Sequence, residues 1–69
     1  MKNNINVIFG NKVAELRKGE KMSQEELADK CGLHRTYLGA IERGEKSPTL
    51  NTVYKIAKGL NININQLFI

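Results

Sequence analysis

The residues with the clearest potential for chemistry lie between positions 35 and 43, where basic, hydroxyl-bearing and small side chains recur at helical spacing. They are Arg35, Thr36, Gly39, Ala40 and Arg43. The planar guanidinium of Arg35 can donate two hydrogen bonds to a guanine, and Thr36 can bond to a base edge or touch a thymine methyl group. Small residues at 39 and 40 would let such a helix enter a major groove about 12 Å wide. The alternative is an ordinary solvated helix face, so the interpretation depends on the surrounding elements.

A catalytic or metal site cannot be assembled from the other reactive residues. Cys31 and His34 are the single cysteine and the single histidine, and a tetrahedral metal site needs more ligands than these two. No serine, cysteine or carboxylate is arranged around His34 to form an activated nucleophile. We therefore expect no enzyme activity, no metal and no cofactor, and we expect Cys31 to be a small buried apolar residue.

Length and composition predict one domain over residues 1–69. A chain with 41% hydrophobic and 26% charged residues can build one core of this size but cannot divide it. Eleven Lys and Arg against seven Asp and Glu give a net charge of +4, which favours a polyanionic partner through counterion release. The first residues contain no long apolar run, so we expect no signal peptide and no membrane span, and hence a cytoplasmic protein.

Apolar spacing and a capping signal predict the first two helices. The first covers about residues 6–18, with its apolar stripe at Phe9, Val13 and Leu16 and its end at Gly19. Ser23 and Glu26 then form a capping box, in which the serine hydroxyl accepts from the Glu26 amide and the carboxylate accepts from the serine amide. A second helix therefore begins at Gln24.

The second helix and a third one are predicted to meet at a tight turn. Gly32 can adopt the left-handed conformation that ends a helix, and the third helix begins at His34 or Arg35 and ends at Gly44. Two short helices at a steep angle need a small residue where they approach, and Ala28 supplies it. The apolar residues that anchor both helices are Leu27, Leu33, Leu38 and Ile41. This arrangement leaves the face of Arg35 outward and favours groove reading over a merely solvated face.

The rest of the chain predicts two more helices. The fourth starts at 47–49, and its buried stripe consists of Leu50, Val53, Tyr54, Ala57 and Leu60. The tail alternates apolar and polar residues at first, as a strand would, but an isolated strand has no sheet to join. We expect a short helix capped by Asn63, with Leu67 and Phe68 on the side of Ile64. The predicted fold is all-α, a compact five-helix bundle that contains a helix-turn-helix.

The segment from Ser23 to Gly44 resembles the helix-turn-helix of the Cro/phage-repressor family, and the likeness covers nearly the whole chain. Within that family, the string His-Arg-Thr-Tyr followed by Ile-Glu-Arg-Gly-Glu is similar to the controller proteins of restriction-modification systems. The resemblance implies a lambda-repressor-like domain that binds a double-stranded DNA operator and regulates transcription. An antitoxin that binds DNA and also a protein partner is the alternative.

The resemblance also implies roles for single residues. Those that match DNA-contacting positions are Gln24, His34, Arg35, Thr36, Tyr37, Ala40, Arg43 and Lys46. Arg35 and Thr36 are expected on bases. The residues expected on the phosphate backbone are Gln24, His34, Tyr37, Arg43 and Lys46. The ring of Tyr37 has a second interpretation, in which it packs beside the first turn of the helix. Arg17 and Glu42 match a partly buried ion pair of the family.

Two further surfaces are predicted for protein partners. In activators of the family, acidic residues at the positions of Glu25 and Asp29 contact RNA polymerase; the alternative is that both are solvated charges near the positive end of a helix. Family members pair two recognition helices as a homodimer. The apolar C-terminal end offers an interface through Leu60, Ile62, Ile64 and Phe68, unless these residues all close the core.

Overall fold

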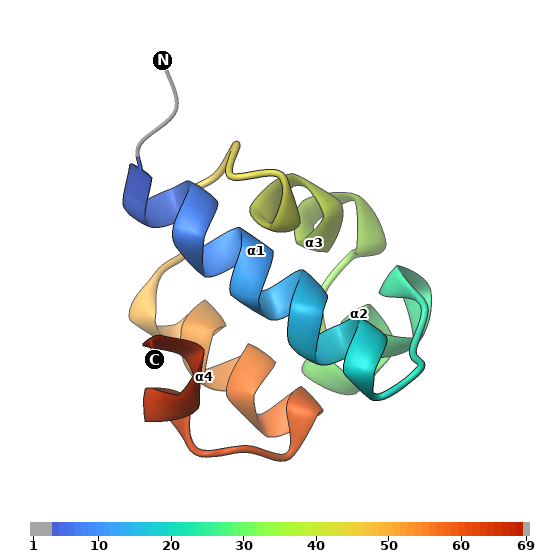
Figure 1. Ribbon diagram of the computed structural model, residues 1–69. Coiled ribbons are helices and arrows are strands. Elements are labelled where there is room, and N and C mark those ends of the chain that lie inside the picture. The colour runs from blue at the N-terminus through green and yellow to red at the C-terminus, as the bar shows by residue number, and fades with distance from the viewer. Residues whose placement is uncertain (1–3, 69) are drawn as a thin grey trace.

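Four α-helices and one short 3-10 helix surround a common core in the computed structural model, which describes residues 4–68 (Figure 1). They are α1 (Asn4–Gly19), α2 (Gln24–Cys31), α3 (Arg35–Glu42), α4 (Leu50–Leu60) and the 3-10 helix η1 (Ile64–Phe68). In Figure 1, α1 crosses the front of the molecule, with α3 on one side of it and α4 on the other. Residues 4–68 contain no strand, which agrees with the all-α prediction.

The tail forms a 3-10 helix, so the prediction of a fifth α-helix is wrong. The amide of Gln66 donates to the carbonyl of Asn63 at 3.0 Å, which is the three-residue spacing of a 3-10 turn. The Asn63 amide donates to the side-chain oxygen of Gln66 at 3.0 Å, so the contacts that start η1 come from the main chain of Asn63. The first helix also begins earlier than predicted, at Asn4.

The predicted capping box and turn around α2 are confirmed. The Glu26 amide donates to Ser23 Oγ at 3.0 Å, and the Ser23 amide donates to Glu26 Oε1 at 2.8 Å. The hydrogen bond from the Ser23 amide is the main cause that lowers the pKa of Glu26. At the other end, Gly32 has φ of 70°, and the amide of Leu33 donates to the carbonyl of Ala28 at 2.9 Å. This left-handed closure turns the chain directly into α3.

The next two helices start at side-chain caps. His34 precedes α3, and its Nδ1 accepts from the amide of Thr36 at 3.1 Å. Thr49 precedes α4, and its Oγ1 accepts from the amide of Thr52 at 3.2 Å. Each cap satisfies an amide that the helix itself cannot bond. The starts of α3 and α4 are thus set by local sequence.

The core consists of side chains from all five elements. The largest fully buried ones are Val13, Leu27, Leu38, Ile41, Ile56 and Leu67. Cys31 is 5% exposed, and burial raises the pKa of its thiol to about 11, so the prediction of an inert apolar cysteine is confirmed. Residues 4–68 include no cluster of metal-ligating side chains and no helix long and apolar enough to cross a membrane.

Close helix contacts depend on glycines that the sequence reasoning did not single out for packing. A Cβ at Gly10 would lie 2.2 Å from the carbonyl oxygen of Ile41, so α1 can touch the end of α3 only through a glycine. A Cβ at Gly59 would lie 2.4 Å from Cys31 Sγ, which fixes α4 against α2. Both positions hold the helix-turn-helix on the rest of the bundle.

The predicted buried stripe of α4 is wrong at two positions. Leu50 is 82% exposed and Tyr54 is 56% exposed. Leu50 is the first residue of α4, at its N-terminal end. Tyr54 lies about 100° around the helix from buried Val53. Tyr54 instead has the ammonium of Lys58 5.8 Å from its ring centroid.

Candidate nucleic-acid interface

The exposed face of α3 begins at its N-terminal end. His34, Arg35 and Thr36 are exposed, and within residues 4–68 the side chains of Arg35 and Thr36 take part in no hydrogen bond or ion pair. Tyr37 is half-buried, with its ring packed against the core. Ala40 is only 7% exposed, so its prediction as a DNA-contacting residue is wrong.

A shallow polar hollow lies between the start of α2 and the outer face of α3. The residues that line it are Gln24, Arg35, Thr36, Gly39 and Arg43. Four of these five were predicted to contact DNA. The structure therefore brings together side chains that come from two helices and are up to 19 positions apart in the sequence. Lys46 is also exposed, in the segment between α3 and α4.

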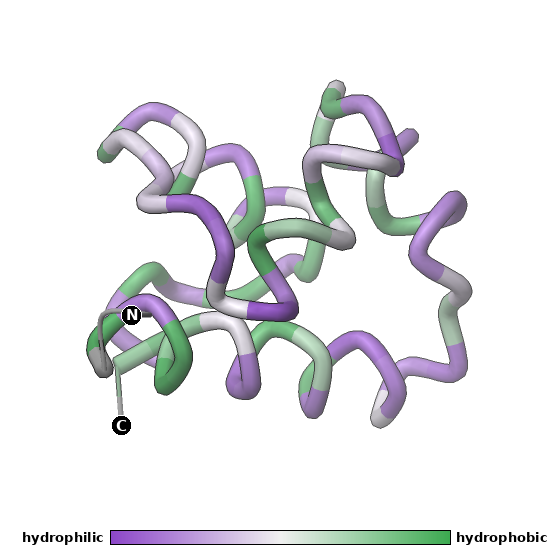
Figure 2. The backbone as a smooth tube through the Cα atoms, turned by 90° about the horizontal axis from the view of Figure 1, so that it is seen from above, coloured by the Kyte–Doolittle hydropathy of each residue, from purple (hydrophilic) through white to green (hydrophobic). Residues whose placement is uncertain are grey.

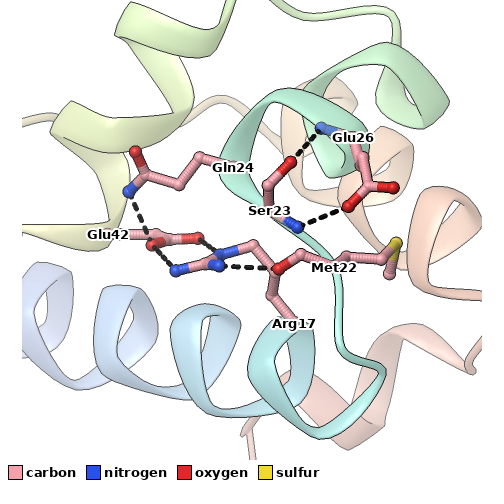
Figure 3. Close-up of polar contacts among 6 residues, drawn as sticks. All are labelled: Arg17, Met22, Ser23, Gln24, Glu26 and Glu42. Carbon is pink, nitrogen blue, oxygen red and sulfur yellow. Dashed lines mark hydrogen bonds and ion pairs between the residues drawn. The ribbon is translucent and has the colours of Figure 1, made fainter.

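The predicted Arg17–Glu42 ion pair is present and is buried (Figure 3). Arg17 Nε donates to Glu42 Oε2 at 2.8 Å, and Arg17 Nη2 donates to Glu42 Oε1 at 3.0 Å. The third nitrogen of the guanidinium, Nη1, donates to the carbonyl of Met22 at 2.8 Å. The side chains are 11% and 5% exposed, so this bidentate pair ties α1, the chain before α2 and the end of α3 together.

Glu42 also accepts a hydrogen bond from Gln24, a contact that the sequence reasoning missed. Gln24 Nε2 lies 2.9 Å from Glu42 Oε1. A carboxylate can only accept, so Gln24 must turn its nitrogen toward Glu42 and its amide oxygen away, as Figure 3 shows. The buried ion pair therefore sets how Gln24 presents its amide in the polar hollow.

Arg43 is held at the far end of α3 by a second acidic residue. Its Nε and Nη2 donate to Glu45 at 3.0 and 3.2 Å, and these hydrogen bonds raise the pKa of Arg43. The backbone fixes Glu45 in turn, because Gly44 has φ of 76° and the Glu45 amide donates to the Ala40 carbonyl at 2.9 Å. The sequence did not single out Glu45, although its spacing of two residues from Arg43 across a glycine was a usable signal.

Comparison with known proteins agrees with this geometry. The family model described as helix-turn-helix matches residues 13–67. The chain belongs to the helix-turn-helix family. Its relatives include the control protein C.BamHI of Bacillus amyloliquefaciens, 46% identical over 68 residues, with 97% of this chain and 84% of the relative covered. The control protein C.SmaI of Serratia marcescens is 43% identical over 63 residues, which cover 91% of this chain and 75% of the relative.

A solved structure has the same architecture. The restriction-modification controller protein C.AhdI from Aeromonas hydrophila superposes with a TM-score of 0.94 at 39% identity. The match covers 96% of this chain and 100% of that one. The matched residues contain α2 and α3, the two short helices joined by the tight turn at Gly32. In a helix-turn-helix the second of the two is called the recognition helix, and α3 stands at that place.

The acidic pair of the helix-turn-helix lies beside the start of the recognition helix. Glu25 and Asp29 are exposed and line a second shallow hollow with Leu33, His34 and Arg35. The two carboxylates are four residues apart on α2, hence on one face. They are available to a partner that approaches from the α2 side.

An apolar surface of the helix-turn-helix protein lies where α1 begins and η1 ends. Its large exposed residues are Ile5, Ile8 and Phe68, at 53%, 62% and 57%. Ile64, at the start of η1, is 41% exposed. Phe68 stacks on buried Phe9 at 5.6 Å between ring centroids, which ties the two segments together. Figure 2 shows hydrophobic stretches at this end of the molecule and hydrophilic ones at the opposite end of α1.

Two of the predicted interface residues lie elsewhere. Leu60 is 5% exposed and belongs to the core, so its prediction as an interface residue is wrong. Ile62 is half-buried and packs on the same core. Leu60 lies in the last turn of α4, on the buried stripe of that helix. Its side chain is therefore already covered by residues of the same chain.

Proposed function

We propose that this protein is a sequence-specific DNA-binding transcriptional regulator of the restriction-modification controller type. The observation that carries the proposal is the recognition helix, whose exposed first turn holds Arg35 and Thr36 beside the fixed amide of Gln24. Arg35 reads a guanine, and Thr36 contacts a neighbouring base edge. Gln24, His34, Tyr37, Arg43 and Lys46 hold the phosphate backbone. The 46% identity to C.BamHI supports the controller assignment.

The regulator acts as a homodimer on a pseudo-palindromic operator. One protomer measures 29 Å in its longest dimension and has one recognition helix, whereas half-sites of such operators lie about 34–36 Å apart. Two copies are needed to read both half-sites. The apolar surface of Ile5, Ile8 and Phe68, together with Ile64, is the contact between them, because an exposed patch of this kind is unfavourable in water unless a partner covers it.

Glu25 and Asp29 serve in activation. They lie on the outward side of α2, next to the DNA-contacting residues, where a polymerase bound to adjacent DNA could reach them. Their negative charges are unfavourable next to DNA, whereas they would complement a basic surface on a protein partner.

The direct test is a footprint on the DNA upstream of the protein's own gene. We expect a protected segment with two related half-sites, and tighter binding there than on a duplex of random sequence at equal salt concentration. Equal affinity for both duplexes across a salt titration would contradict sequence-specific binding.

The dimer is tested separately by Ile64→Lys. Desolvating a charge in a symmetric apolar contact occurs twice per dimer, so sedimentation should show a shift toward monomer and operator affinity should fall. Lys55→Ala, a change at an exposed residue of α4, is the control. A folded Ile64→Lys protein that remains dimeric would show that the interface lies elsewhere.

A further inference from the structure

Gly39 stands in the middle of the recognition helix, where a glycine weakens a helix relative to alanine. The core does not require it. A Cβ there would have as its nearest neighbours Arg43 Nη1 at 3.2 Å, Gln24 Oε1 at 3.4 Å and Gln24 Nε2 at 3.7 Å. These atoms are the ends of two polar side chains at the interface. At Gly10 and Gly59 the nearest atoms are instead a backbone carbonyl and a buried sulfur.

The guanidinium of Arg43 lies between Glu45, which bonds it, and Gly39. Glu45 bonds its Nε and Nη2, and Nη1 lies over the bare backbone of Gly39. Gln24 reaches the same spot from α2, with its nitrogen bonded to Glu42. The hollow is also lined by Arg35, so two guanidinium groups and an amide converge around one glycine.

We propose that Gly39 is a positioning residue for DNA binding, which lets Arg43 lie beside Gln24 so that both meet one backbone phosphate. The proposal rests on the proposed function, in which α3 contacts DNA. The Arg43 guanidinium is a donor, and so is the second N–H of Gln24 Nε2, whose first N–H is bonded to Glu42. A phosphate oxygen accepts from several donors at once. A methyl group at 39 would push the end of the Arg43 side chain away by a few tenths of an ångström and would move the donors apart.

Gly39→Ala separates folding from binding. The new methyl group requires Arg43 to shift by a few tenths of an ångström, because 3.2 Å is closer than a Cβ normally approaches a neighbour. The helix itself is favoured by alanine. We expect an unchanged or higher melting temperature and about a tenfold loss of DNA affinity, the size of one weakened charge-assisted hydrogen bond.

The matched control is Gly19→Ala. Gly19 is the exposed last residue of α1, and a Cβ there would meet nothing within 4 Å. The probe is a duplex that the wild-type protein selects from a random-sequence pool. We expect wild-type affinity for Gly19→Ala on this duplex. Wild-type affinity for Gly39→Ala would overturn the proposal.

A double variant shows whether Gly39 acts through Arg43. In an Arg43→Ala background, Gly39→Ala should cost little further affinity, because the displaced group is already gone. The same tenfold loss in both backgrounds would mean that the methyl group acts on DNA or on the helix directly, and would overturn the positioning role. If the wild-type protein selects no duplex from the pool, the proposed function fails, and the role of Gly39 fails with it.

Discussion

The two ends of the recognition helix hold their polar side chains in opposite ways. At the C-terminal end, Glu42 is bonded to Arg17 and Gln24, and Arg43 is bonded to Glu45. At the N-terminal end, the side chains of Arg35 and Thr36 are exposed and have no hydrogen-bonding partner within residues 4–68.

The difference matches what each end would bind. Phosphates recur at fixed spacing along any duplex. The groups that contact them can therefore be oriented before binding, because the same orientation fits DNA of every sequence. A base edge has its own pattern of donors and acceptors, and a side chain that reads it must keep its full hydrogen-bonding capacity for that base. We infer that the C-terminal end sets the register of the protein and the N-terminal end sets its sequence preference.

The largest expected effect comes from breaking the fixed end. Glu42→Ala leaves Arg17 buried without its counter-charge, which should lower the free energy of unfolding by about 3–5 kcal/mol. A domain of this length has only about 3–10 kcal/mol in total, so urea denaturation should show a largely destabilised protein. Lys12→Ala, at an exposed ion pair with Glu15, should change stability by less than about 1 kcal/mol.

A double replacement sharpens this result. Arg17→Met together with Glu42→Leu removes both charges, so much of the lost stability should return. Gln24 would still lack the carboxylate that orients it, and DNA affinity should remain below that of the wild type. A double variant as unstable as Glu42→Ala would show that the pair does not act as a buried charge pair.

The second effect, at the exposed end, should appear in specificity. Arg35→Ala should lower operator affinity by about 1–3 kcal/mol and relax the preference at one base position in each half-site. Stability should not change, because the side chain has no partner within the described residues. Competition between operator variants measures both quantities. Equal losses on operator and random duplexes would assign Arg35 to the phosphate backbone instead.

How far the sequence could predict this structure depends on the range of the interaction. The capping box at Ser23 and the left-handed Gly32 involve neighbours within four residues, and sequence alone indicated both of them. The Arg17–Glu42 pair spans 25 positions, and only the family resemblance suggested it.

Contacts set by packing were missed. The hydrogen bond from Gln24 to Glu42 depends on how two helices cross, as does the close approach at Gly10. Periodicity also could not show that the side chain of Leu50 is exposed beyond the edge of the core, or that the side chain of Leu60 is buried within it. An apolar residue in a stripe has the same appearance in sequence whether a core or a partner covers it.

Lys46→Ala should have a smaller effect on DNA affinity, and this effect distinguishes a phosphate contact from a contact that recognises bases. It is exposed beyond the end of α3, with no oriented partner within residues 4–68. As a phosphate contact, its replacement by alanine should weaken binding to all duplexes alike and reduce the salt slope by roughly one. A titration of affinity against salt on operator and random DNA measures this slope. A loss confined to the operator would place Lys46 among the base-reading residues.

The smallest expected change in DNA affinity concerns Glu25 and Asp29, whose carboxylates lie on α2 beside the N-terminal end of α3. Glu25 lies in the first turn of α2, where its charge favours the helix by a few tenths of a kcal/mol. Asp29 lies a turn later and gains less. Beside DNA both charges are unfavourable, so Glu25→Gln with Asp29→Asn should leave operator affinity unchanged or slightly higher.

Transcription from a promoter with the operator just upstream should nevertheless fall if these carboxylates contact a basic surface of RNA polymerase. The single variant Glu15→Gln, at an exposed carboxylate on α1, is the matched control and should activate normally. Activation that persists at full operator occupancy in the double amide variant would leave both residues as solvated charges that help only to start α2.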